Sequence, residues 1–289
     1  GGCVGGLPTG WLGGMLWGWQ NLVRGGRLAL AGHMESRRLG CARLVGCGAA
    51  AWRGGLETVQ ELLYPRRCAV CGDGAPGAAS HLCDLCRHQL EFIAPPFCRV
   101  CGDPVAGHFE RAYTCLACTA RPPAFDVARS LFRYSAGGEL VRQLKYQGGV
   151  WLAPMLGEWL AAAAQTHLPL ERLETVAPVP LHPVRRRERS YNQSELLARS
   201  VARALGLPHA PRLLRRVRPT ETQTHLTAAA RRHNVEAAFA VREARWVQGR
   251  RVLLVDDVMT TGATVDACAR ALKQAGAARV FVLTAARGG

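Results

Sequence analysis

The stretch RVLLVDDVMTTGAT, residues 251–264, decides the fold. Its opening run, RVLLV at 251–255, is apolar after the first arginine, which is typical of a strand buried on both faces of a parallel sheet. A loop of threonines and glycine then leads into a segment of helical periodicity, 264–275, which Gly276 ends. The apolar run ARVFVLTA at 278–285 follows as the next strand. This strand–helix–strand order predicts a βαβ unit and therefore an open, mostly parallel α/β sheet.

The chain before this unit supplies further strands and helices. Periodicity predicts strands at 127–134 and 175–180, and helices at 138–146, 151–164 and 192–206. The last of these helices begins with polar residues that can cap it and ends before Gly206. The C-terminal part of the chain is therefore expected to be a sheet with helices on both faces.

Two adjacent carboxylates, Asp256 and Asp257, follow the predicted strand directly. Ligands of open parallel sheets bind at the carboxyl ends of the strands. The backbone N–H groups that open the next helix, with the hydroxyls of Thr260, Thr261 and Thr264, form a cup suited to a phosphate. Carboxylates beside such a cup need hydrogen-bond donors, which either a vicinal diol or hydrated Mg²⁺ can supply. A ribose 5-phosphate meets both requirements.

Other interpretations of this stretch are weaker. A phospho-receiver domain begins with a similar VLLVDD run, but it needs a further acid and a lysine downstream, and the only later lysine is Lys273 in the predicted helix. A P-loop nucleotide-binding site needs G-x-x-x-x-G-K-[ST], which the sequence lacks. An ordinary strand-to-helix turn with acidic caps remains the alternative without a ligand.

A cysteine-rich segment precedes the α/β part. Eight of the 12 cysteines form four Cys-x-x-Cys pairs, Cys68/Cys71, Cys83/Cys86, Cys98/Cys101 and Cys115/Cys118. Two such pairs complete a tetrahedral, structural Zn²⁺ site, so we expect two zinc ions. Sequential pairing closes the shortest loops and is the expected arrangement. A disulfide framework needs an oxidising compartment, and a redox motif needs one pair and not four.

Charge and composition narrow the choice of partners. The formal net charge is +16, which favours phosphates, nucleotides or nucleic acid. Lys145 and Lys273 are the only lysines, so nearly all cations are arginine, as in proteins from GC-rich genomes.

The first residues show neither helical nor strand periodicity, and no secretory signal or convincing membrane span occurs in them. We therefore expect a poorly structured extension at 1–55, with translation starting near Met34, and a cytoplasmic protein. The RPP at 121–123 separates a double zinc ribbon at 56–121 from an α/β domain at 122–289, and a short helix is expected at 56–63.

At this point the chain resembles the ComF/GntX family of type I phosphoribosyltransferases. VLLVDDVMTTGAT at 252–264 resembles the phosphoribosyl pyrophosphate (PRPP) signature, and the cysteine module resembles that family's zinc ribbon. VPLHPVRRRERSYNQSELLA at 179–198 resembles its pyrophosphate-side loop, and TETQTHLTAAARRHNVEAAF at 220–239 its mobile segment. Ser190 stands where the family commonly has glycine, and Ala230 where an acid often stands.

The resemblance implies Mg²⁺-dependent transfer at C1′ of PRPP to an unidentified acceptor, and hence a glycosyltransferase of the pentosyltransferase class. The catalytic residues it implies are Asp256, Asp257 and Arg187. The PRPP-binding residues it implies are Asp256, Asp257, Thr260, Thr261, Gly262, Ala263, Thr264, Arg185, Arg189 and Lys145. A solvated basic face is the other interpretation of the arginine run at 185–189. Purine-base enzymes of the superfamily carry Asp where Thr260 stands, so ordinary purine salvage is disfavoured.

The resemblance also implies a role in DNA uptake. The alternative to an enzyme is a non-catalytic accessory protein of natural transformation, which binds single-stranded DNA or senses PRPP. Proteins of the DNA-uptake machinery are then further partners. The cysteine module has few aromatic residues for base stacking, so such DNA binding should be mainly to phosphates and sensitive to salt.

Overall fold

The computed structural model describes residues 67–73, 81–107, 112–217 and 238–288. These belong to two compact units, and the one that carries the sheet includes Asp84–Gly289. The predictions for the extension at 1–55, for Met34, for the helix at 56–63 and for most of 220–239 lie outside the described residues.

Four parallel strands form the main sheet in the order β1-β6-β5-β2. Their bounds are β1 Val127–Arg133, β2 Thr175–Pro178, β5 Arg251–Met259 and β6 Arg279–Arg287. All four residues of β2 are buried, as are Val252 to Asp257 of β5. The prediction of an open parallel α/β sheet is confirmed.

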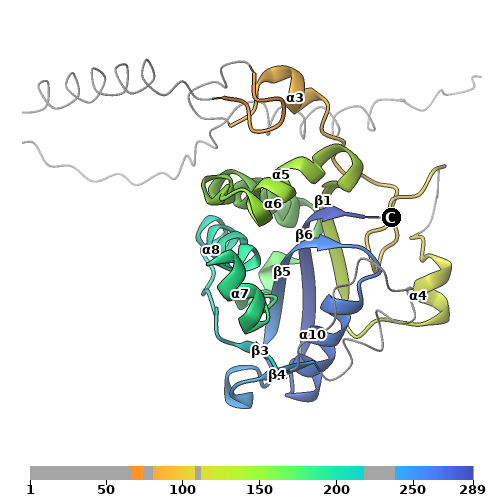
Figure 1. Ribbon diagram of the computed structural model, residues 1–289. Helices are drawn as coiled ribbons and strands as arrows, with labels where there is room; N and C mark the ends of the chain where they lie inside the picture. The colour runs from red at the N-terminus through yellow and green to blue at the C-terminus, as the bar shows by residue number, and fades with distance from the viewer. Residues whose placement is uncertain (1–66, 74–80, 108–111, 218–237, 289) are drawn as a thin grey trace, which may run out of the picture. The chain divides into compact units, whose positions relative to one another are not determined.

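Helices cover both faces of this sheet (Figure 1). On one face lie α5, α6 and α8, and on the other lies α10. Their bounds are α5 Tyr134–Tyr146, α6 Ala153–His167, α8 Gln193–Leu205 and α10 Ala263–Gln274. Asn192 caps α8 by accepting a hydrogen bond from Ser194 N, and Gly206 ends it in the left-handed region at φ 65°. The polar cap and the terminal glycine expected from the sequence are both confirmed.

Short elements complete the chain. They are α3 Asp84–His88, α4 Leu116–Ala120, α7 Pro183–Arg189, and the 3₁₀ turns Val150–Leu152, Leu170–Arg172 and Ala244–Trp246. Strands β3 Leu214–Arg216 and β4 Phe239–Val241 pair antiparallel as a separate ribbon. No helix among the described residues combines the length and apolarity needed to cross a membrane.

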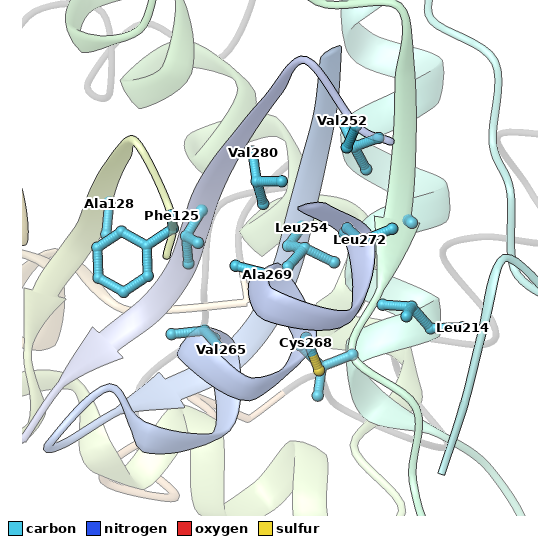
Figure 2. Packing of buried hydrophobic residues seen from close by; sticks show 14 of the residues in the cluster. Phe125, Ala128, Leu214, Val252, Leu254, Val265, Cys268, Ala269, Leu272 and Val280 are labelled. Atoms are coloured by element: carbon cyan, nitrogen blue, oxygen red, sulfur yellow. The ribbon is translucent and has the colours of Figure 1, made fainter. Parts of the chain in front are cut away.

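The core under α10 shows why this βαβ unit folds as it does. Val265, Cys268, Ala269 and Leu272 recur at helical spacing and are buried against Val252, Leu254 and Val280 of the sheet (Figure 2). Cys268 is a fully buried thiol in this packing, as expected for a small core residue.

Strand β5 is longer than the sequence predicts, and the difference shapes the site. We expected it to end at Val255, but it continues through both aspartates to Met259. The reason is β6, which extends to Arg287 and pairs with Val258 and Met259. On its other side β2 ends opposite Val255. One flank of Asp256 and Asp257 is therefore a paired strand, and the other is open to ligands and helices.

The edge strand β1 is covered by the cysteine module. Ile93 N donates to Leu131 O at 2.9 Å, Arg133 N to Glu91 O at 3.1 Å and Ala128 N to Val100 O at 2.7 Å. These hydrogen bonds satisfy backbone groups that an exposed edge would offer to another chain. The module thus completes the sheet at this edge.

Ser190, which ends α7, is the one non-glycine residue of the described segments with positive φ, at 65°. A side chain in the left-handed region costs about 1–2 kcal/mol, which glycine avoids. This explains why the resembling family commonly has glycine here.

We therefore predict that Ser190→Gly raises the free energy of unfolding by about 0.5–1 kcal/mol, after allowance for the greater freedom of unfolded glycine. Urea denaturation of the zinc-loaded protein measures it. Ser190→Ala, which keeps the Cβ, is the control and should bring no such gain. Equal stability of the glycine and alanine variants would contradict the assignment of strain to this residue.

Candidate active site and metal centre

The two adjacent carboxylates lie near the carboxyl end of the sheet and are almost out of solvent. Asp256 is 9% exposed and Asp257 is 5% exposed. Burying an ionised carboxylate costs several kcal/mol unless it is paired and hydrogen-bonded. The structure must therefore provide partners for both.

Those partners come from two helices on the same face. Lys145, in the last turn of α5, places Nζ 2.8 Å from Asp257 Oδ1. Gln193, the first residue of α8, donates from Nε2 to Asp257 Oδ2 at 2.6 Å. Ser194 Oγ donates to Asp256 Oδ1 at 2.7 Å, and the same oxygen accepts from Asp257 N at 2.9 Å. The start of α8 and the end of α5 thus converge on the acid pair.

The pair is electrostatically uneven. Burial and the neighbouring charge of Asp257 raise the pKa of Asp256 to about 7. The hydrogen bonds that Asp256 accepts from Ser194 and from Asp257 N oppose this increase but do not cancel it. Burial lowers the pKa of Lys145, but the charge of Asp257 and the hydrogen bond to it outweigh burial and raise the pKa above its ordinary value. Lys145 is therefore a fixed cation, and Asp256 is the group that changes charge near neutral pH.

A cavity of about 290 Å³ opens beside the acid pair. Its wall is formed by Lys145, Val179, Pro180, Leu181, Asn192, Gln193, Ser194, Arg216, Asp256, Asp257, Val258, Thr260 and Thr264. Five of the predicted site residues, Lys145, Asp256, Asp257, Thr260 and Thr264, therefore share one cavity. This volume suits a small polar ligand.

The loop between β5 and α10 forms one side of this site. Gly262 caps α10 in the left-handed region at φ 76°. Thr261 Oγ1 accepts from Ala263 N at 3.4 Å, which leads the chain into the helix. The loop thus directs the N-terminus of a helix of 12 residues towards the acid pair, as a phosphate site requires.

The predicted arginines lie on α7, outside the cavity wall as the described residues define it. The Arg189 guanidinium lies 4.6 Å from the centre of the Tyr146 ring. Arg185 is 3.4 Å from Glu188, and Arg187 is exposed. Their helix begins just after Leu181, which does line the cavity. Their contact with a diphosphate stays a prediction.

Four polar residues of the wall were not predicted as individual site residues. Asn192, Gln193 and Ser194 were expected in a helix cap and in the segment 179–198 that resembles the pyrophosphate-side loop, but not as partners of the acids, which Gln193 and Ser194 bind. Their side chains are buried, which an ordinary solvent-facing cap does not require. Arg216 comes from β3, where no sequence pattern distinguished it from other arginines.

A larger hollow of about 470 Å³ lies at the opposite edge, where β5 and β6 begin. Two of its three arginines have acidic partners. Arg251 binds Glu174 at 2.9 Å, and Arg279 binds Asp126 at 2.6 Å. These contacts tie the amino ends of the strands to each other, so the acid pair at the other edge is the stronger candidate.

The cysteines form two groups of thiols, Cys68, Cys71, Cys83 and Cys86, and Cys98, Cys101, Cys115 and Cys118. In each group the four sulfur atoms lie within 4.8 Å of one another, and no disulfide joins the described cysteines. The sequential pairing is therefore confirmed.

The second thiol group fits zinc. A tetrahedral ion with Zn–S bonds of ~2.3 Å separates its sulfurs by about 3.8 Å, and Cys101 Sγ lies 3.7 Å from Cys115 Sγ. Burial opposes ionisation of Cys98, but N–H groups of Cys115, Cys101 and Val100 lower the pKa of its thiol to about 7. Gly102 follows the first pair at φ 69°, and a Cβ there would lie 2.6 Å from Ala128 O. The turn and the close approach to β1 both require glycine.

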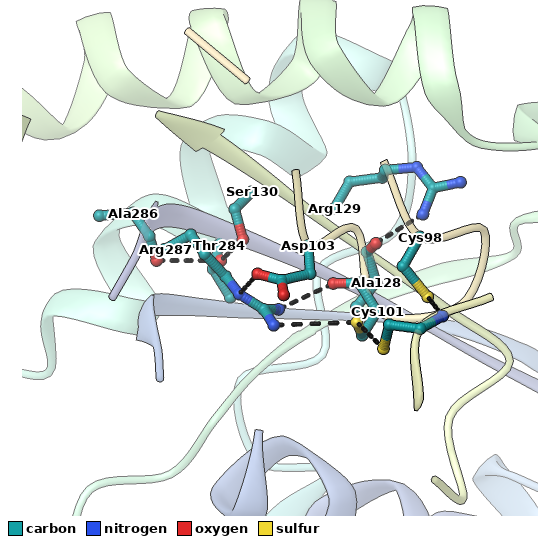
Figure 3. A network of polar contacts seen from close by, with 10 residues as sticks. Cys98, Cys101, Asp103, Ala128, Arg129, Ser130, Thr284, Ala286 and Arg287 are labelled. Carbon is teal, nitrogen blue, oxygen red and sulfur yellow. Dashed lines mark hydrogen bonds and ion pairs between the residues drawn. The ribbon is translucent and has the colours of Figure 1, made fainter. Parts of the chain in front are cut away.

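Two arginines of the sheet lie beside this thiol group, and one of them contacts a thiol (Figure 3). Arg287, the last residue of β6, donates to Cys101 O at 2.8 Å and lies 3.8 Å from Cys101 Sγ. It also lies 3.2 Å from Asp103. Arg129 of β1 donates to Ala128 O at 2.7 Å and to Arg99 O at 3.2 Å. Four thiolates around Zn²⁺ carry excess negative charge, which these guanidinium groups offset.

The fold and the two sites define the class of protein, a phosphoribosyltransferase-type α/β domain joined to a double zinc ribbon. The double zinc ribbon domain family matches residues 59–119, and the phosphoribosyl transferase domain family matches residues 191–289.

Curated relatives identify the family. Competence protein F of Haemophilus influenzae is 32% identical over 76% of this chain and 96% of that protein. The DNA utilization protein YhgH of Salmonella typhi is 36% identical over the same shares. Competence protein ComFC of Bacillus subtilis is 27% identical over 68% of this chain and 80% of that protein. The chain belongs to the ComF family, as its motifs indicated.

We predict that Asp256→Asn stabilises the ligand-free protein increasingly as the pH rises. The pKa of Asp256 rises from 3.8 to about 7 on folding. Its stability contribution is therefore full below about pH 4 and is lost as the pH rises to about 7. In urea denaturation, the stability of the variant relative to wild type should increase by about 1 kcal/mol between roughly pH 6 and pH 8.5.

The control is Glu158→Gln on the exposed face of α6, whose effect should not vary over this range. A pH-independent difference for Asp256→Asn would show that the buried carboxyl ionises without penalty. Both proteins are compared at each pH, so any effect of acid on zinc binding cancels.

For the second thiol group, we predict that Arg287→Gln speeds zinc release about tenfold, because outer contacts of this kind change metal affinity by about 10–100-fold. Transfer of zinc to the chromogenic chelator 4-(2-pyridylazo)resorcinol measures the rate. Arg203→Gln, exposed on α8, is the matched control. Unchanged release from Arg287→Gln would mean that the guanidinium has no influence on the thiolates.

Proposed function

We propose that this protein binds PRPP with Mg²⁺ and transfers the phosphoribosyl group to an acceptor. The observation that carries this proposal is the buried pair Asp256 and Asp257, which faces a polar cavity beside the hydroxyl loop at the start of α10. A phosphate in that loop would place the sugar of the same ligand against the carboxylates.

In the proposed reaction the bond between C1′ and the pyrophosphate oxygen breaks, and a bond forms from C1′ to a nucleophilic atom of the acceptor. The electron pair of the broken bond leaves with pyrophosphate, and the acceptor gives its proton to a base. Positive charge develops on the sugar, and carboxylates nearby stabilise it. In this proposal Asp257, which Lys145 holds in an ion pair, is one of these carboxylates.

Mg²⁺ prefers carboxylate and phosphate oxygens, so the donor set of Asp256 and Asp257 fits it. When bound with PRPP, it neutralises charge on the departing diphosphate. The arginines of α7 and Arg216 are the protein's own cations for this purpose. Arg216 lines the cavity. Burial lowers its pKa below the ordinary value, although electrostatic interactions with Cys268 and Asp256 oppose this decrease.

We further propose that the activity serves DNA uptake in the cytoplasm. Two relatives are named as competence proteins and one as a DNA utilization protein. Thiols that are grouped for zinc and not joined in disulfides suit a reducing compartment. Tyr146, 67% exposed and stacked with Arg189, offers a surface on which a base of single-stranded DNA could lie. This exposed pair favours DNA binding as a second function.

The test of the first function is isothermal calorimetry of PRPP with the zinc-loaded full chain, with and without Mg²⁺. We expect Mg²⁺-dependent binding that Asp256→Asn/Asp257→Asn weakens at least tenfold, because charge-assisted hydrogen bonds to the ligand are lost (about 1.5–3 kcal/mol each). The exposed Glu158→Gln is the control for loss of one acidic charge. A folded wild-type protein that ignores PRPP would overturn the proposal. If PRPP binds but no acceptor is converted, the protein is a PRPP sensor and not a transferase.

A further inference from the structure

One buried polar atom beside the acid pair has no partner. Gln193 is 4% exposed and lines the cavity. Its Nε2 donates to Asp257 Oδ2 at 2.6 Å, but its Oε1 accepts no hydrogen bond from any residue that the structure describes. A buried acceptor without a donor costs about 1–3 kcal/mol, and such atoms are rare in folded proteins.

The orientation of this amide follows from its neighbour. A carboxylate that is ion-paired with Lys145 can only accept hydrogen bonds, so the amide nitrogen must face Asp257. The oxygen is then the atom left over. Reversal of the amide would place two acceptors against each other, so it does not remove the unsatisfied group.

Three of the four oxygens of the acid pair are already engaged within the protein. Lys145 and Gln193 occupy the two oxygens of Asp257. Asp256 Oδ1 accepts from Ser194 and from a backbone N–H. Gln193 Oε1 is thus a buried acceptor, on a residue of the cavity wall, that a ligand can engage without breaking a contact within the described protein.

We propose that Gln193 is a substrate-binding residue whose Oε1 accepts a hydrogen bond from a ribose hydroxyl of the ligand. This inference rests on the proposed function, since it assigns a contact within the same site. Gln193 then has two roles in one amide, as its nitrogen fixes Asp257 and its oxygen recognises the sugar. No described residue pairs with this oxygen, so a sugar hydroxyl can become its partner.

The test compares ribose 5-phosphate with inorganic phosphate, both titrated without added Mg²⁺, on wild type and Gln193→Met. Methionine keeps the length of the side chain and removes both hydrogen-bonding groups. We expect affinity for ribose 5-phosphate to fall about tenfold, the equivalent of one lost hydrogen bond to a buried group, and affinity for phosphate to stay within about twofold. Gln165→Met, exposed on α6, is the matched control.

A second measurement separates direct contact from an effect through Asp257. In an Asp257→Asn background, Gln193→Met should still weaken ribose 5-phosphate binding if Oε1 meets the sugar. No further loss in that background would make Gln193 a positioning residue for Asp257 and overturn the proposal. An equal loss of affinity for phosphate and ribose 5-phosphate would overturn the proposal too. The titrations are then repeated with Mg²⁺, and a loss of affinity seen only there would also overturn it, because it would point to a contact with metal-bound water.

The two proposals fail differently. Wild-type protein that binds neither PRPP nor ribose 5-phosphate contradicts the proposed function. Wild-type protein that binds both, with Gln193→Met unchanged, contradicts the role of Gln193 alone. Zinc content and the melting temperature of each variant confirm that the fold is intact.

Discussion

The burial of two neighbouring carboxylates is the constraint on which the site depends. An uncompensated buried charge costs several kcal/mol, a large fraction of the stability of a typical domain. Asp256 and Asp257 are therefore tolerated only because α5 supplies Lys145 and α8 supplies Gln193 and Ser194. Helices from separate parts of the chain must dock against β5 to provide them. The helices that pack on this face of the sheet therefore also supply the partners that the buried carboxylates need.

Strand β6, which pairs with β5, connects the acid pair with the zinc ribbon. β6 reaches Arg287, which contacts Cys101, and the register places Arg287 opposite Met259 of β5. Met259 directly precedes the loop that opens α10, and it accepts a hydrogen bond from Gly288 N at 3.0 Å. Ala124 N, just after the ribbon, donates to Asp266 of α10 at 2.5 Å. The ribbon therefore contacts the end of β6, and the residue that leads from the ribbon into β1 contacts α10.

Much of this arrangement follows from the sequence because it depends on local signals. Apolar runs and helical spacing gave β5, α10 and β6, and the Cys-x-x-Cys spacing gave the two thiol groups. The length of β5 could not be predicted, because it depends on where β6 and β2 end. Arg216 was missed for a similar reason, since its place in the wall depends on long-range packing of β3. Gln193 looked like a cap because capping and acid binding require the same polar residue types.

The unevenness of the acid pair suggests why the site keeps two carboxylates where one would be easier to bury. Asp257 is held by a cation and an amide within the protein. Burial and the charge of Asp257 raise the pKa of Asp256 to about 7, so a small interaction can change its charge state. A ligand that brings hydroxyl donors or a divalent cation favours the ionised form and recovers the energy that burial costs. The site is therefore least stable without a ligand, and that instability would contribute to the affinity for the proposed sugar phosphate with its Mg²⁺.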